Sequence, residues 1–295
     1  MDKEKNKSKI SLITAMLIFS SIGIFRKYIP LNSGLIAFVR GFIGALFLIA
    51  FSMFAKKEPD FSAIKKNALV LCVSGAFIGF NWILLFEAYN YTSVAVATLC
   101  YYMAPVFVIL ASPFIFGEKL TAKNIVCVIG ALVGMIFVSG IFNIGKINFS
   151  EMRGILLGLG AAILYASVVL INKKIEAIKA EDRTTIQLSS AAIVILPYVL
   201  FFEGLPELSE ISPIVLLLLV FVGIVHTGFA YALYFGSMKN IEARTVALFS
   251  YIDPVGAIIL SAVILKERMD ILSVIGMVMI LGFTLINELP EKNRE

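Results

Sequence analysis

The feature that most restricts the fold of this chain is a series of apolar segments, each about 20 residues long, that recur roughly every 30 residues. About 20 apolar residues suffice for one helix to cross the hydrocarbon core of a bilayer. The chain is 60% hydrophobic and 15% charged, with a mean hydropathy of +0.95. Soluble domains carry about 25% charged residues. The sequence therefore predicts an all-α integral membrane protein with many spans and no large soluble domain.

Ten apolar segments divide the chain, and short polar connections separate them. The first segment ends at Arg26 and Lys27 with no small-residue cleavage site after it, so we expect an uncleaved helix rather than a signal peptide. The ten transmembrane helices are expected at residues 11–29, 34–54, 66–88, 93–115, 121–140, 153–173, 184–202, 212–236, 243–265 and 269–288.

Lysine and arginine residues outside these segments are distributed unevenly between the two sides of the membrane. If the N-terminus is cytoplasmic, 18 of them lie on the cytoplasmic side and 6 on the outer side. Cytoplasmic loops carry the excess of positive charge in membrane proteins. We therefore expect a multi-pass protein of the cell (plasma) membrane with both termini in the cytoplasm.

The chain contains an internal repeat with an offset of 149 residues, in which residues 79–118 align with residues 228–267 without a gap. We expect two five-helix units, over residues 8–142 and 151–289. Because five is an odd number, the second unit must cross the membrane in the opposite orientation, as in the inverted-topology repeats of many secondary transporters. Identical pairs include Gly79/Gly228, Tyr102/Tyr251, Pro105/Pro254, Ser112/Ser261 and Glu118/Glu267.

Both copies place a proline thirteen residues before a glutamate, in PVFVILASPFIFGE at 105–118 and in PVGAIILSAVILKE at 254–267. This pattern resembles the EamA repeat of the drug/metabolite transporter superfamily, and the resemblance covers nearly the whole chain. It implies a substrate path between the two halves and alternating access, but no particular substrate. The glycine expected nine residues after the glutamate is present as Gly276, whereas Cys127 replaces it in the first copy.

Pro105 and Pro254 lie within predicted spans at equivalent positions of the two copies. A proline bends a helix because it lacks the backbone N–H and clashes with the preceding turn. The carbonyl that it frees needs a partner or a polar cavity in the membrane. We expect both helices to bend near these prolines and to flank one central cavity. A structural kink with no ligand nearby is the alternative.

Two ionisable residues lie deep within predicted spans. Asp253 directly precedes Pro254, and its repeat mate is Ala104; His226 is in the middle of the 212–236 segment. An ionisable group at this depth is costly unless it is paired or faces a wet cavity. We expect both side chains to reach the central cavity and to set the polarity of the substrate or exchange protons. The alternative is that each makes structural hydrogen bonds only.

Other polar and aromatic side chains at membrane depth complete the expected substrate site. Tyrosine and tryptophan at such depth need hydrogen-bond partners, which suggests a cavity for an amphipathic or aromatic metabolite. Asn81 lies on the helix face equivalent to that of His226 and Tyr234. The predicted substrate-binding residues are Asn81, Trp82, Tyr101, Tyr102, Tyr165, His226, Tyr234 and Asp253, with Pro105 and Pro254 as structural kinks.

Three further charged residues have more than one interpretation. Arg40, about two turns into its segment, could bind a substrate carboxylate, extend toward the membrane surface or pair structurally, and structural pairing is favoured. Glu118 and Glu267 lie at segment ends beside Lys119 and Arg268. We expect these glutamates to cap the next helix or to brace a loop.

The sequence favours a secondary transporter, in the export direction, for a small organic metabolite. A membrane-embedded enzyme and a receptor or scaffold without transport are the alternatives, and within transporters uniport and proton coupling both stay open. We expect no cofactor, no metal site and no nucleic-acid partner; the expected partners are the substrate, protons and the bilayer. The GxxxG spacings Gly130/Gly134 and Gly154/Gly158 permit close helix contacts inside a monomer or in a homodimer.

Overall fold

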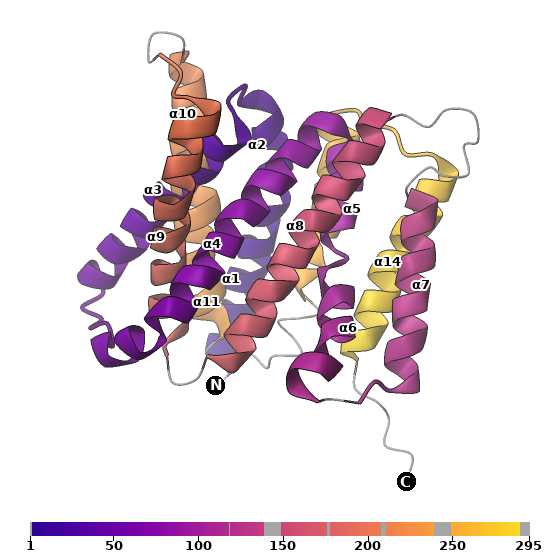
Figure 1. Cartoon of the computed structure of the whole chain (residues 1–295), viewed down its shortest axis with the longest axis horizontal. Coiled ribbons are helices and arrows are strands. Elements are labelled where there is room, and N and C mark those ends of the chain that lie inside the picture. The colour runs from indigo at the N-terminus through magenta and orange to yellow at the C-terminus, as the bar shows by residue number, and fades with distance from the viewer. Residues whose placement is uncertain are drawn as a thin grey trace.

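The computed structural model describes residues 2–117, 119–138, 149–175, 178–207, 211–238 and 249–289, and these residues form helices and no strand. The start of α1 and the end of α14 lie at the same end of the molecule (Figure 1). The first half contains α1 (Asp2–Ser20), α2 (Ile22–Tyr28), α3 (Ser33–Phe54), α4 (Phe61–Tyr91), α5 (Val94–Tyr101), α6 (Ala104–Phe116) and α7 (Ala122–Val138). The second contains α8 (Phe149–Lys174), α9 (Ala180–Tyr198), the π-helical η1 (Val199–Glu203), α10 (Pro213–Phe221), the π-helical η3 (Val222–Phe229), α11 (Ala230–Met238), α13 (Ile252–Ile264) and α14 (Ile271–Glu288).

The outer surface of the helix bundle is apolar. Among the described residues, 7 helical segments are long and apolar enough to cross a membrane, and Ala122–Val138, Ile252–Ile264 and Ile271–Asn287 are shorter apolar helices. Large apolar side chains such as Phe114 and Phe201 are 91% and 82% exposed. A water-soluble monomer rarely exposes contiguous apolar surface on this scale, so the chain is a multi-pass membrane protein.

Two predicted helices are each broken into two pieces, and the predicted 243–265 helix also has a turn at Tyr251, directly before α13. The 11–29 segment forms α1 and α2, and at the break Ser21 donates its hydroxyl to the Ile18 carbonyl at 2.8 Å. The 93–115 segment forms α5 and α6, with a turn at Tyr102 and Met103 just before Pro105. The proline ring cannot follow a regular helical turn, which explains the position of this second break.

Several helix boundaries differ from the predicted ones. The predicted 66–88 helix begins earlier, as α4, because Asp60 caps it by accepting a hydrogen bond from the Ala63 N–H at 3.0 Å. The predicted 212–236 helix is one stack of α10, η3 and α11, with a π-helical middle part. The start of the predicted 243–265 helix and the end of the 121–140 helix lie outside the described residues.

The helices α7 and α14 pack against each other in antiparallel orientation. The Lys123 ammonium, at the start of α7, donates to the Asn287 carbonyl at 3.0 Å, near the end of α14. A Cβ atom on Gly134 would lie 2.8 Å from the Gly276 carbonyl oxygen, so this crossing requires glycine. The GxxxG glycines of α7 therefore face another helix of the same chain.

The helices α3 and α9–η1 form a second antiparallel pair. At one end of the pair the Lys57 ammonium lies 2.9 Å from the Glu181 carboxylate. At the other end the Glu203 carboxylate accepts hydrogen bonds from the Gly34 and Leu35 N–H groups at 2.9 and 3.0 Å. Glu203 thereby caps the N-terminus of α3 from another part of the chain.

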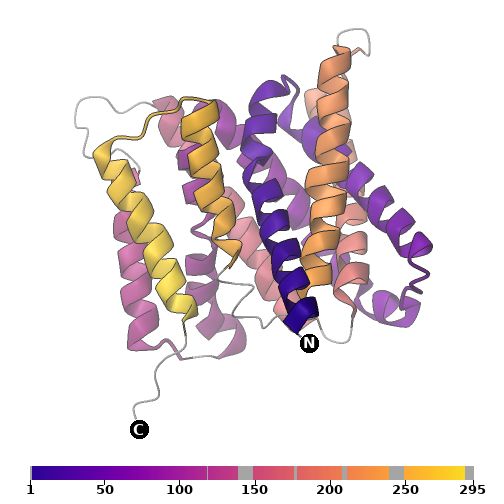
Figure 2. The ribbon, with the colours of Figure 1, turned by 180° about the vertical axis from the view of Figure 1, so that it is seen from behind.

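The N-terminal helix closes the bundle on one side. Figure 2 shows α1 between the α10–α11 stack and α13, and α1 contacts both α11 and α13. Leu12, Ala15 and Met16 on the inner face of α1 are buried against apolar residues of these two elements. This packing places the second half of α1 beside the interior of the protein.

Candidate functional site: a central cavity

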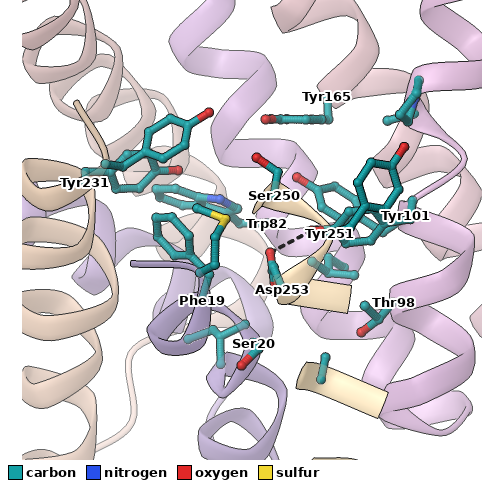
Figure 3. A pocket seen from close by; sticks show the side chains of 18 of the residues that line it. Phe19, Ser20, Trp82, Thr98, Tyr101, Tyr165, Tyr231, Ser250, Tyr251 and Asp253 are labelled. Atoms are coloured by element: carbon teal, nitrogen blue, oxygen red, sulfur yellow. Dashed lines mark hydrogen bonds between the residues drawn. The ribbon is translucent and has the colours of Figure 1, made fainter. Parts of the chain in front are cut away.

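The interior holds a cavity of about 300 Å³, within the size range of small-molecule sites. Nine of its 20 described lining residues are aromatic, and Figure 3 shows Trp82, Tyr101, Tyr165 and Tyr231 arranged around Asp253. The lining residues are Met16, Phe19, Ser20, Ile22, Arg40, Trp82, Leu85, Tyr89, Thr98, Tyr101, Tyr102, Ala104, Pro105, Tyr165, Tyr231, Tyr234, Ser250, Tyr251, Asp253 and Ala257.

The two equivalent helix breaks of the repeat meet at this cavity. Tyr102 stands at the turn between α5 and α6, and Tyr251 stands at the turn directly before α13. Both tyrosines line the cavity, together with Ala104 and its repeat mate Asp253. Pro105 also lines it, whereas Pro254 is buried behind Asp253 in the first turn of α13.

Asp253 is the acidic residue among the described residues that line the cavity, and its position is set by the start of α13. It lies in the first turn of α13, where the helix dipole favours a negative charge. The Tyr102 hydroxyl donates a hydrogen bond of 2.7 Å to its Oδ2 atom; this bond is the dashed line at Asp253 in Figure 3. The bond joins the break of the first copy to the break of the second copy.

Arg40 supplies a positive charge to the same wall. Its guanidinium lies over the Trp82 ring, 4.1 Å from the centroid, and 5.3 Å from the Phe86 centroid. Its Nε–H donates to the Thr227 hydroxyl at 3.1 Å. No described carboxylate lies within 4.0 Å of the guanidinium, so its described structural partners are these two rings and the threonine.

Six of the eight residues predicted to bind substrate line the cavity, and two lie elsewhere. The two exceptions are Asn81 and His226, each only 1% exposed. The six that the structure brings together are Trp82, Tyr101, Tyr102, Tyr165, Tyr234 and Asp253.

Asn81 joins two helices instead of facing the cavity. Its side-chain amide donates a hydrogen bond of 2.6 Å to the Ala161 carbonyl of α8. Neighbouring residues of an α-helix point about 100° apart; here Trp82 lines the cavity, whereas Asn81 is buried against α8. The prediction that Asn81 lines the cavity is therefore wrong.

His226, in η3, packs against α2 and against Phe221 at the end of α10. Its Nε2 atom lies 2.8 Å from the Ser21 hydroxyl, and its ring makes edge contacts with Phe25 and Phe221 at centroid distances of 4.8 and 5.8 Å. The prediction that it shares a face with Tyr234 assumed a regular α-helix. The π-helical turn of η3 is wider, so the expected four-residue spacing does not hold and His226 does not reach the cavity.

Two cavity residues that the sequence reasoning missed follow a recognisable spacing. Tyr231 precedes Tyr234 by three residues, and Tyr89 follows Trp82 by seven, so each pair shares a helix face. Extending each expected face by one or two turns would have found both.

Glu267 has structural contacts, although not with the next helix. Its Oε2 atom accepts hydrogen bonds from the Val94 N–H at 2.9 Å and from the Ser261 hydroxyl, while Lys27 lies 4.0 Å from Oε1. Glu267 thus caps α5, whereas Asp270 caps α14. Its repeat mate Glu118 lies outside the described residues.

A multi-pass helical protein with an aromatic cavity where two broken helices meet has the architecture of a membrane transporter. The sequence agrees: it matches the EamA-like transporter family over residues 7–140 and 152–288. The chain belongs to this family, whose members are transporters rather than enzymes.

The chain is similar to named transporters over most of its length. It is 30% identical over 294 residues to the Bacillus subtilis (strain 168) protein named "Uncharacterized transporter YxxF", covering 99% of this chain and 93% of that protein. It is 28% identical over 213 residues to the Escherichia coli (strain K12) protein named "Probable amino-acid metabolite efflux pump", covering 69% and 70%. A solved crystal structure has the same fold, with a TM-score of 0.65 at 20% identity over 96% of both chains.

Proposed function

We propose that this protein is a secondary transporter of the plasma membrane that exports a small organic metabolite by alternating access through the central cavity. The observation that carries the proposal is that both broken helices contribute to the wall of one cavity. Broken helices at a repeat interface are where secondary transporters bind their substrates. The efflux activity in the name of the Escherichia coli relative supports the outward direction.

The proposed architecture is ten spans in two inverted repeats, over residues 8–142 and 151–289. Under the offset of 149 residues, α7 and α14 are repeat mates, and so are α3 and α9. Each pair of mates packs directly together and runs antiparallel. Mates related by an axis along the membrane normal would run parallel, so the antiparallel pairing supports an axis in the membrane plane.

Contacts at the α7–α14 crossing support the same two-fold relation. Gly130 faces Phe283, and Gly134 faces Met279. The offset converts Gly130 to Met279 and Gly134 to Phe283, so each contact is the image of the other. Such reciprocal contacts are the mark of an isologous interface.

Two further sets of helix contacts also correspond under the offset. The contact of α4 with α9 corresponds to that of the α10–α11 stack with α3, and the contact of α8 with α6 corresponds to that of α1 with α13. A cavity on such an axis can open to either side by equivalent movements of the two halves. When the cavity is open to one side, the other side must be closed. The Glu267 contacts with α5 would stabilise one of the two closed sides, because they join the second half to the first.

Transport through the cavity is tested by filling it. Liposomes containing the protein and loaded with a mixture of amino acids, amines, nucleosides and vitamins should lose at least one component faster than protein-free liposomes. Ala257→Phe places a ring in the cavity wall and should abolish this loss, measured by mass spectrometry of the external solution. Ala262→Phe, on the exposed side of the same helix, is the matched control and should behave as wild type. Equal efflux with Ala257→Phe and wild type, or none in either, would refute transport through this cavity.

The inverted topology is tested by single-cysteine labelling. Lys146→Cys and Lys179→Cys are made with Cys72, Cys100 and Cys127 replaced by serine, and intact cells are treated with a membrane-impermeant maleimide. We expect labelling of position 146 in intact cells and of position 179 only after permeabilisation, because the second position lies among the cytoplasmic charges. Labelling of both positions from the same side contradicts ten spans with cytoplasmic termini.

A further inference from the structure

Arg40 is the only lysine or arginine among the described residues that line the cavity. Its side chain is buried, with an exposed fraction of 5%, and it lies about two helical turns from the start of α3. A cation at this depth of a membrane protein costs several kcal/mol unless it is paired or hydrated, and such residues mark functional sites. Its surroundings therefore indicate what it binds.

The cavity wall fixes the plane of the Arg40 guanidinium. The group lies over the faces of Trp82 and Phe86, and its Nε–H donates to the Thr227 hydroxyl. Thr227 comes this close because α3 has a glycine there: a Cβ atom on Gly44 would lie 2.9 Å from the Thr227 Cβ. The cation–π contacts and the one hydrogen bond leave the two terminal nitrogens of the guanidinium free of described protein partners.

The carboxylate of the same cavity is not the counter-ion of Arg40. Asp253 accepts a hydrogen bond from Tyr102, and no ion pair joins it to Arg40. The neutral partners of Arg40 offset only part of the cost of burying its charge, since a cation–π contact contributes about 0.5–2 kcal/mol and a hydrogen bond about 1 kcal/mol. A ligand with a negative group would offset the rest of the cost of burying the Arg40 charge.

We propose that Arg40 is the binding site for the carboxylate of the substrate, so that the transported molecule is an organic carboxylate with an aromatic or apolar body; this rests on the proposed transport function. The two terminal nitrogens of a guanidinium match the two oxygens of a carboxylate. Arg40 is the one lysine or arginine of the described wall, which matches one carboxylate group on the ligand. The tyrosine rings and Trp82 offer faces against which an aromatic body packs.

Trp82 allows a direct binding test, because it is the only tryptophan in the chain and it lies against Arg40. Purified protein in detergent is titrated with two matched pairs, 3-phenylpropionate against 3-phenylpropionamide and phenylalanine against phenylalaninamide. Trp82 fluorescence is excited where phenyl groups do not absorb. We expect the carboxylate of at least one pair to bind at least about tenfold more tightly than its amide, equivalent to about 1.4 kcal/mol. Equal affinities in both pairs, or no response to any of the four, would overturn the proposal.

The variant Arg40→Gln tests the residue itself. It should remove the preference for the carboxylate, and Arg40→Lys should retain it only in part, because an ammonium cannot form the paired contact. Arg153→Gln is the matched control, since Arg153 lies 4.2 Å from the Tyr91 ring but outside the cavity, and it should keep the full preference. A full preference in Arg40→Gln would overturn the assignment, and the wild-type titration stands even if this variant does not fold.

The titration and the efflux experiment separate the two proposals. Efflux that is blocked by Ala257→Phe, together with no preference for carboxylates, rejects the Arg40 site and keeps the transporter. Carboxylate binding that depends on Arg40, together with no efflux, keeps the binding site and rejects transport.

Discussion

Replacing Asp253 by asparagine is expected to lower the transport rate at least about tenfold while the amount of protein in the membrane stays normal. Asparagine has nearly the same shape and keeps an oxygen that can accept the Tyr102 hydrogen bond. It removes only the capacity to carry a negative charge or to exchange a proton. A tenfold loss corresponds to about 1.4 kcal/mol in the activation free energy, a modest value for the carboxylate of a largely aromatic cavity.

The measurement is initial efflux of the molecule found in the liposome experiment, normalised to the protein content of the vesicles. Asp60→Asn is the matched control: Asp60 lies at an exposed helix start, where asparagine caps equally well. Transport by Asp253→Asn at the wild-type rate, with the same response to a pH gradient, would make Asp253 a structural residue. A loss of the pH-gradient response alone would favour proton coupling over uniport.

Replacing Glu267 by alanine is expected to destabilise the protein by about 2–4 kcal/mol and to lower its apparent melting temperature by about 5 °C or more. The carboxylate accepts a hydrogen bond from the first N–H group of α5 and another from Ser261, and alanine leaves both donors without this acceptor. The contacts connect the two halves at one end of the protein. We therefore expect transport to fall as well, because that end no longer closes tightly.

A double-mutant cycle separates this contact from a general effect of the substitution. Thermal unfolding is measured for Glu267→Ala, Ser261→Ala and the double variant, with Glu58→Ala, in an exposed connection, as the control. The two effects should be non-additive by about 0.5 kcal/mol or more, since the residues are hydrogen-bonded. Additive effects, or a melting temperature of Glu267→Ala equal to that of Glu58→Ala, would contradict a bracing role.

The helix breaks were predictable because their cause is local. Pro105 disrupts the helix by its own covalent structure, and the repeat transfers the same expectation to Pro254. The aromatic residues just before the prolines then had to lie at the breaks, as Tyr102 and Tyr251 do. The position of Ser21, where the first segment is also broken, has no comparable signal in the sequence.

The partner of each polar side chain was not predictable in the same way. Glu267 was expected to act near its own helix end, but it binds the start of α5, 173 residues away in sequence. For Arg40 structural pairing was favoured, but the sequence did not name the partners, which are two aromatic rings and a threonine. The partner of a polar side chain depends on which helices are neighbours and on how each helix is rotated about its axis.

The sequence by itself determined the membrane class, the apolar segments, the two-fold repeat and the position of the breaks at the prolines, because hydropathy, period and backbone geometry act over a few residues. Only the tertiary structure decided which deep polar side chains share the cavity. The π-helical turn of η3 directs His226 to Ser21 and Thr227 to Arg40, and the packing of α4 on α8 directs Asn81 to Ala161. A helix buried in a bundle takes the rotation that its neighbours allow, and that rotation decides which of its polar residues face the substrate path.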